Sequence, residues 1–102
     1  QFWLTPDRYR NHHVFPSVSA EAAEFLLEKQ VVGLGIDTLS PDRPKDGYLV
    51  HQTLLGAGKY IIENVANSGA LPPLGSYSLA LPIKTQGGTE APIRLIALIN
   101  GI

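Results

Sequence analysis

The stretch SAEAAEFLLEKQVVGLGID, residues 19–37, decides the fold class of this chain. Its first part, SAEAAEFLLEK, predicts a helix, because Ser19 is a favourable N-cap residue. The apolar residues Ala22, Phe25 and Leu26 follow the i, i+3, i+4 spacing of one helix face. Its second part, VVGLGI, is short and apolar with β-branched residues, which predicts a buried strand. A helix that leads directly into a buried strand is typical of the second half of a β-α-β unit.

The rest of the chain alternates short apolar runs with segments rich in glycine and proline. These patterns predict, in order, an aromatic-packed loop over 1–16, a helix over 19–29, a strand over 31–36, a solvated loop over 38–48, a helix over 51–58, and strands over 60–62, 77–83 and 93–99. The last two strands are expected to form a hairpin, since a Gly-Gly pair lies between them. The predicted fold class is α/β, a partial mixed sheet with one main helix.

Composition narrows the classes of function. The chain has 102 residues, of which 44% are hydrophobic and 17% charged, enough for the core of one small domain or of a piece of a larger one. A net charge of -1 without a run of one sign argues against nucleic acid as a partner. No apolar stretch reaches about 18 residues, so no membrane-spanning helix is expected.

Two further features of the sequence bear on compartment and chemistry. The chain has no cysteine, which excludes disulfides, thiolate zinc sites and a cysteine nucleophile. Its first residues, Gln1-Phe2-Trp3, lack the charged and apolar regions of a signal peptide and do not resemble a translation start. We therefore expect a cytoplasmic protein whose native sequence begins upstream of residue 1.

His51 and Glu63 combine the chemistry of metal ligands. His51 stands at the beginning of the helix predicted over 51–58, and Glu63 follows twelve residues later, at the end of the strand predicted over 60–62. Imidazole and carboxylate together suit Zn²⁺ or Mn²⁺, and binding residues often gather at the ends of elements. A single His and Glu at this distance also occur together by accident. The residues alone therefore leave a metal site and a chance pair as alternatives.

Other polar residues have simpler interpretations. Asp37 ends the predicted buried strand, where it is either a site residue or a turn residue whose carboxylate holds the next amides. Side chains of the adjacent His12 and His13 diverge in regular structure, so they are expected to be solvated loop histidines. Gly33 and Gly35 lack a third glycine before a helix, so they indicate close backbone packing and not a dinucleotide site.

Four short motifs occur in a characteristic order: GIDTLS at 35–40, HQTLL at 51–55, YIIEN at 60–64 and ALPIK at 80–84. With the helical segment before them, they resemble the C-terminal half of the cyclase family, which includes bacterial kynurenine formamidases and isatin hydrolases. The resemblance spans roughly residues 15–99. It implies the C-terminal half of the cyclase-family swivelling β/β/α fold. Residues 1–102 are accordingly expected to be the C-terminal part of a single cyclase-like hydrolase domain.

The resemblance also implies a set of site residues. His51 and Glu63 match ligands of the second metal in the two-metal formamidases, so they are expected to converge in space and to bind Zn or Mn. Asp37 and Thr38 are expected to orient neighbouring groups. The family's His-x-Gly-Thr-His-x-Asp-x-Pro segment, which supplies most metal ligands, has no match in this sequence. No catalytic residue is therefore expected in this chain.

For function, the resemblance implies a metal-dependent amidohydrolase, arylformamidase-like, that acts on a small aryl amide or a cyclic amide. The expected partners are the N-terminal half of the same protein and further copies in a homo-oligomer, and residues 1–102 alone are expected to be inactive. Phe2, Trp3 and Phe15 are candidates to line an aromatic pocket, with core packing as the alternative. The competing class is a non-catalytic scaffold or binding protein that retains the cyclase-like fold.

Overall fold

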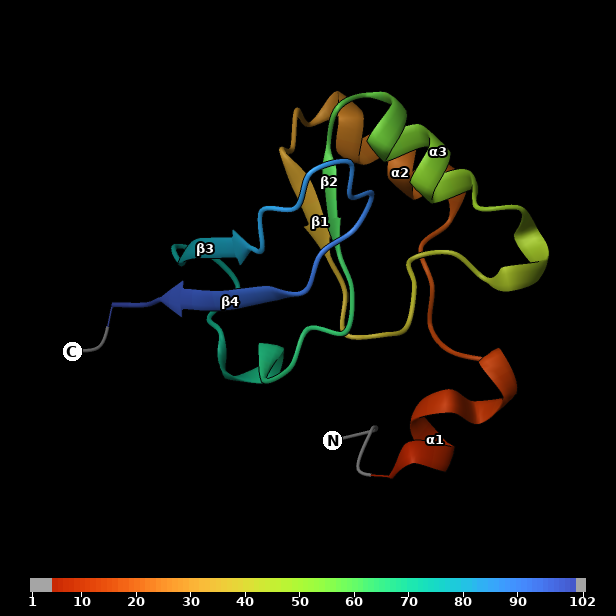
Figure 1. Cartoon of the computed structure of the whole chain (residues 1–102), viewed down its shortest axis with the longest axis horizontal. Coiled ribbons are helices and arrows are strands. Elements are labelled where there is room, and N and C mark those ends of the chain that lie inside the picture. The colour runs from red at the N-terminus through yellow and green to blue at the C-terminus, as the bar shows by residue number, and fades with distance from the viewer. Residues whose placement is uncertain (1–4, 101–102) are drawn as a thin grey trace. The chain divides into compact units, whose positions relative to one another are not determined.

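The computed structural model describes residues 5–100 of the chain (Figure 1). The chain forms two compact units, Gln1–Ala66 and Asn67–Ile102. Helices and short paired strands make up the described part, which confirms the predicted α/β class. No helix within residues 5–100 is long and apolar enough to cross a membrane.

The first unit begins with a helix that the sequence analysis missed. α1 spans Pro6–Arg10 and continues into the 3-10 turn η1, Asn11–His13, where a loop was predicted. Pro6 occupies the first turn and the Thr5 side chain accepts a hydrogen bond from the Arg8 amide, so the local caps are sufficient to start the helix. Of the predicted aromatic contacts, Phe15 is buried, whereas Phe2 and Trp3 lie outside the described residues.

The predicted main helix is confirmed as α2, Ala20–Glu28, and Ser19 caps it by accepting a hydrogen bond from Ala22 N at 3.1 Å. The predicted apolar face is wrong in part: Leu26 packs against the core, but Ala22 is exposed. The helix buries Ala23, and Phe25 on the predicted face remains exposed. Leu26 and Leu27 stand at i+3 and i+4 from Ala23, so two overlapping sets of residues satisfy helical spacing. The set that contains Ala23 is the one buried against α3, because a small side chain permits closer approach of a neighbouring helix.

A β-α-β unit follows α2 (Figure 1). It consists of β1 (Gly33–Gly35), α3 (Leu49–Gly56) and β2 (Tyr60–Ile62). The two strands pair in parallel, with Leu34 opposite Ile61. The predicted strands at 31–36 and 60–62 and the predicted second helix are thus confirmed, although α3 begins two residues earlier than predicted.

The core of the first unit lies between the two helices and one face of this strand pair. Ala23 of α2 meets Val50 and Leu54 of α3, and all three are almost fully buried. Leu34 and Ile61, which share a face because they are in register, pack against this cluster. The helices therefore cover one face of the β1–β2 pair, and the strand ends remain available for polar residues.

Close backbone packing was predicted at both strand glycines, and the structure confirms it for Gly33. The ring of Tyr60 lies where a β-carbon on Gly33 would stand, so only glycine fits opposite it. Gly35 has more room, with a Val65 methyl at 3.6 Å from the corresponding point. Close backbone packing, and not cofactor binding, accounts for Gly33.

The loop between β1 and α3 is more buried than its composition suggests. Thr38 is 1% exposed and Asp42 3% exposed, so the prediction of a solvated loop is wrong for this half. The carbonyl of Pro41 accepts a hydrogen bond from Val18 N at 2.8 Å, which ties the loop to the segment before α2. The second half, including the 3-10 turn η2 at Pro44–Asp46, is mostly exposed as predicted.

The second unit contains the predicted hairpin. After the 3-10 turn η3 (Ser68–Ala70), β3 (Tyr77–Pro82) pairs antiparallel with β4 (Ile93–Leu98). Tyr77 lies opposite Leu98 at one end of the ladder. The described strands thus form two separate pairs, each within its own unit.

Candidate metal centre

His51 lies in the first turn of α3, a helix that lacks a local cap. The N-cap residue is Tyr48, whose side chain makes no capping hydrogen bond. Asp42 supplies the missing acceptor from the preceding loop: Oδ1 accepts from Val50 N at 2.8 Å and Oδ2 from His51 N at 2.9 Å. A carboxylate at this position also complements the positive end of the helix dipole.

Asp42 additionally holds the imidazole of His51. The Nδ1 atom of His51 lies 2.7 Å from Asp42 Oδ2. Burial raises the pKa of Asp42, but the hydrogen bonds from Val50 and from the ring and amide of His51, with the attraction of His51, outweigh burial and lower that pKa below its ordinary value. Asp42 is therefore ionised at neutral pH and can only accept. It follows that Nδ1 of His51 carries a proton, and the second ring nitrogen, Nε2, faces outward.

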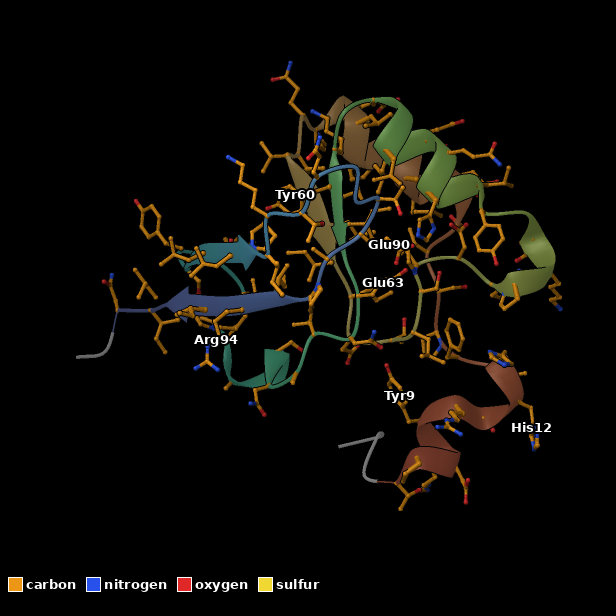
Figure 2. The ribbon with its side chains drawn as sticks, viewed as in Figure 1. Tyr9, His12, Tyr60, Glu63, Glu90 and Arg94 are labelled. Atoms are coloured by element: carbon orange, nitrogen blue, oxygen red, sulfur yellow. The ribbon has the colours of Figure 1, made fainter. Side chains whose placement is uncertain are left out.

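Glu63 follows β2 directly, and the ladder between the strand ends fixes its backbone. Ile36 N donates to Ile62 O at 2.9 Å, and Asn64 N donates to Thr38 O at 3.0 Å. Figure 2 shows Glu63 at this end of β2. The hydrogen bonds on both sides of Glu63 present its carboxylate at the strand end, as the sequence predicted.

The two predicted ligands converge. Nε2 of His51 lies 3.3 Å from Oε1 of Glu63, and about a third or less of each side chain is exposed. Two donor atoms that each lie about 2.0–2.2 Å from one ion, at angles of about 90–110°, stand about 2.8–3.6 Å apart. The observed separation therefore fits two neighbouring positions in the coordination shell of one metal ion.

The tautomer that Asp42 sets in a neutral His51 decides which group Nε2 can face favourably. With the proton of neutral His51 on Nδ1, a lone pair of Nε2 meets a carboxylate oxygen of Glu63, and two acceptors at this distance repel each other. A divalent metal ion or a second ring proton removes the repulsion. The arrangement carboxylate–imidazole–metal, in which Asp42 would be the outer carboxylate, is the usual way to fix the tautomer of a ligating histidine.

The two residues predicted to orient their neighbours, Asp37 and Thr38, differ in burial. Thr38 is buried, its hydroxyl donates to Ser40 O at 3.0 Å, and its carbonyl braces the backbone next to Glu63. Asp37 is exposed at the end of β1, and its charge acts on Tyr9 of α1. Both lie at the strand ends near the pair, and their roles remain predictions.

Other candidate residues do not join the pair. His12 and His13 are exposed on η1, consistent with solvated histidines. In the part of the chain that the structure describes, no group of three or more His, Cys, Asp or Glu side chains is arranged to hold a metal ion. Within residues 5–100, the convergence of His51 and Glu63 is thus a pair of side chains without a third such partner.

Sequence reasoning missed the contribution of Asp42, which was assigned to a solvated loop. A signal was present in the residue before α3: Tyr48 is not a capping residue, so the helix amides needed an acceptor from outside the helix. The ring of Tyr48 also packs edge-on against His51, with ring centres 5.8 Å apart. The contact of Asp42 with α3 spans eight or nine residues and does not follow from helical spacing.

Comparisons with known proteins show which proteins this chain resembles. The Cyclase family model matches residues 1–43. The chain is 32% identical over 89 residues to isatin hydrolase from Roseibium aggregatum. The matched region covers 82% of this chain and 34% of isatin hydrolase. The chain is also 34% identical over 85 residues to kynurenine formamidase from Bacillus mycoides. That matched region covers 81% of this chain and 40% of the formamidase.

A solved structure points the same way. The structure of a potential metal-dependent hydrolase with cyclase activity matches with a TM-score of 0.69 and 38% identity, over 79% of this chain and 40% of that one. The chain thus spans 34% to 40% of the length of the curated relatives described above. Family model, hydrolase relatives and solved structure agree in placing this chain in the cyclase family.

Proposed function

We propose that this chain supplies two ligands, His51 and Glu63, to the divalent metal centre of a cyclase-family hydrolase. The observation that carries the proposal is the 3.3 Å approach of His51 Nε2 to Glu63 Oε1, with Nδ1 of the same ring held by Asp42. Imidazole and carboxylate donors fit Zn²⁺ or Mn²⁺. A metal-dependent hydrolase among the matching structures supports a metal in general.

The residues of this chain would prepare the site in three ways. Asp42 keeps the His51 proton on Nδ1, so that Nε2 offers its lone pair. The backbone ladder through Thr38 and Asn64 holds Glu63 opposite that lone pair. A metal bound there would polarise a substrate carbonyl and lower the pKa of a bound water.

The remaining ligands and the acid/base residue would come from a part of the protein outside residues 1–102. The chain spans 34% to 40% of the curated relatives described above, and its described residues provide no third ligand. We therefore propose that residues 1–102 form the C-terminal part of one hydrolase domain and are inactive alone. The N-terminal half of the same polypeptide is the proposed partner.

The proposed substrate class is a small aryl amide or a cyclic amide. Relatives named for kynurenine formamidase and isatin hydrolase support it. The chemistry common to both is attack of water on an amide carbonyl next to an aromatic ring.

The proposal is tested in the full-length polypeptide with His51→Ala and Glu63→Ala. Each change removes one donor, so metal affinity and hydrolysis of N-formylkynurenine or isatin should fall together, by about 100-fold or more. His12→Ala is the matched control, because His12 is exposed on η1, and it should leave both unchanged. Affinity is measured by competition with a chelator, and activity by absorbance with and without added Zn²⁺ or Mn²⁺.

Two results would contradict the proposal in different ways. Activity that survives both chelation and His51→Ala would refute the metal mechanism. Metal binding that depends on His51 and Glu63, without activity on a broad aryl amide panel, would favour the non-catalytic class.

A further inference from the structure

Tyr48 has a backbone conformation that tyrosine rarely adopts. Its φ is 59° and its ψ is 36°, in the left-handed region where glycine, asparagine and aspartate are the usual residues. Tyr48 is also the N-cap residue of α3, a position that favours Ser, Thr, Asp or Asn, and its side chain makes no capping hydrogen bond. Neither the local backbone nor the helix cap therefore accounts for a tyrosine at this position.

The surrounding chain holds Tyr48 in this conformation. The side-chain amide of Gln52 donates to the carbonyl of Gly47 at 3.0 Å, and the backbone amide of Gln52 donates to the carbonyl of Tyr48 at 3.0 Å. Asp42 fixes the next turn by accepting from the backbone amide of His51 at 2.9 Å. Strained residues that their neighbours hold in place occur mostly at binding and catalytic sites, so the side chain of Tyr48 is a candidate for such a role.

The ring of Tyr48 lies beside the imidazole of the proposed metal ligand His51 and is open to solvent. The two ring centres are 5.8 Å apart, and the angle between the ring planes is 82°. Tyr48 is 56% exposed, and the next residue, Leu49, is 48% exposed. A metal ion stands about 3 Å from the centre of the imidazole that binds it, so an ion on Nε2 of His51 would lie within about 9 Å of the Tyr48 ring centre. An aryl amide is long enough to reach both.

We infer that Tyr48 recognises the aromatic ring of the substrate: an aryl amide whose carbonyl faces the metal held by His51 and Glu63 stacks its ring on Tyr48. The inference rests on the proposed function and deepens it, because it names the residue that selects aryl over alkyl amides. Aromatic side chains beside a few polar groups are the usual composition of a small-molecule site. A stacked or edge-on aromatic pair contributes about 3- to 10-fold in affinity beyond the burial of its apolar area.

Equilibrium binding of two amides of similar size to the full-length polypeptide, at saturating Zn²⁺, tests the inference. Benzamide has an aromatic ring and cyclohexanecarboxamide has none. Tyr48→Leu keeps an apolar side chain without the ring, so the affinity for benzamide, measured by calorimetry, should fall about 3- to 10-fold, and that for cyclohexanecarboxamide by less than about twofold. Tyr48→Phe should bind benzamide as the wild type does. Phe25→Leu is the matched control, because Phe25 is an aromatic residue on α2 that is 54% exposed, and it should leave both affinities unchanged.

Stability measurements separate a binding role of Tyr48 from a packing role. Tyr48→Asn introduces a residue that suits both the left-handed backbone and the N-cap, so the urea midpoint should rise while the affinity for benzamide falls. If an upstream part of the polypeptide covers Tyr48 instead, Tyr48→Asn and Tyr48→Leu should both lower the midpoint, because each removes buried apolar area. That result would refute the inference.

Metal affinity, measured by chelator competition, distinguishes a failure of this inference from a failure of the proposed function. Tyr48→Leu should keep the wild-type affinity for Zn²⁺, because Asp42 holds the ring of His51. Unchanged benzamide binding in Tyr48→Leu, or an equal loss for both amides, would overturn the inference while the ligand assignment stands. Zn²⁺ affinity that His51→Ala leaves unchanged would overturn the proposed function and this inference with it.

Discussion

The two units of the chain differ in how far they bury their apolar side chains. The first unit buries Ala23, Val50 and Leu54 between two helices and a strand pair, and it carries the polar network of the candidate site. The second unit leaves its hairpin uncovered: Tyr77 is 78% exposed and Leu81 52% exposed. The first unit already has a core, whereas the second consists of strands without one.

The hairpin is apolar on both faces. By register, one face carries Tyr77, Leu79, Leu81, Arg94, Ile96 and Leu98, and the other carries Ser78, Ala80, Pro82, Ile93, Leu95 and Ala97. Strands that are apolar on both faces are typical of the interior of a larger sheet that is covered on both sides. The residues of the candidate site thus rest on a local core, whereas the apolar residues of the hairpin remain largely exposed.

The largest effect is expected when residues 1–102 are produced alone. Exposed apolar surface of this kind favours association, so the chain should self-associate or fail to melt cooperatively. Size-exclusion chromatography and circular dichroism measure both properties. A compact monomer with a cooperative transition would show that the hairpin needs no cover and would remove the contrast between the units.

A smaller effect is expected from a Leu→Ala substitution, which can be made in each of the two units. Leu54→Ala removes a fully buried side chain and should lower the free energy of unfolding of the full-length polypeptide by about 2–5 kcal/mol. Leu81→Ala tests whether the hairpin becomes buried there. If it does, this change should also cost about 2 kcal/mol or more, as in other buried sites. Urea denaturation measures the two variants, and a Leu81→Ala cost within about 0.5 kcal/mol would mean that the hairpin stays exposed.

The smallest effect concerns the polar network of the first unit. Asp42→Asn weakens the cap of α3 and the hold on His51, and should cost about 1–3 kcal/mol at neutral pH. Asp46→Asn is the control: its ion pair with Arg43 is at the surface, and its loss should cost about 1 kcal/mol or less. Urea denaturation at several pH values compares the two variants.

The pH dependence of Asp42 has a definite sign. Its pKa is lowered in the folded state, so its contribution is complete above the unfolded value, about 4, and is lost as the pH falls through the folded value. Asp42→Asn should therefore flatten the loss of stability below about pH 4. Equal acid sensitivity of wild type and Asp42→Asn would show that this carboxylate does not carry the effect.

Much of the local structure could be predicted because it depends on neighbours in sequence. Ser19 caps α2 through the amide of Ala22, and the apolar runs form β1, β2, β3 and β4 close to where they were expected. The α1 helix was missed although its cap is local, since Thr5-Pro6 was overlooked as a start signal among aromatic residues. The buried face of α2 was misjudged because two sets of residues fit the same spacing.

The candidate site was predictable only in part. Motifs identified His51 and Glu63, and the resemblance to the cyclase family made them a pair. Asp42 was not identified, because the contacts that give it a role cross from a loop to α3. No periodic pattern records such contacts.

The sequence by itself determined which elements form and which family the chain resembles, because caps, apolar spacing and short motifs act within a few residues. Only the tertiary structure decided the burial and ionisation of Asp42 and the outward direction of His51 Nε2. It also decided the exposure of the hairpin. The physical reason is that burial and charge depend on every group that surrounds an atom, and most of those groups are distant in the chain.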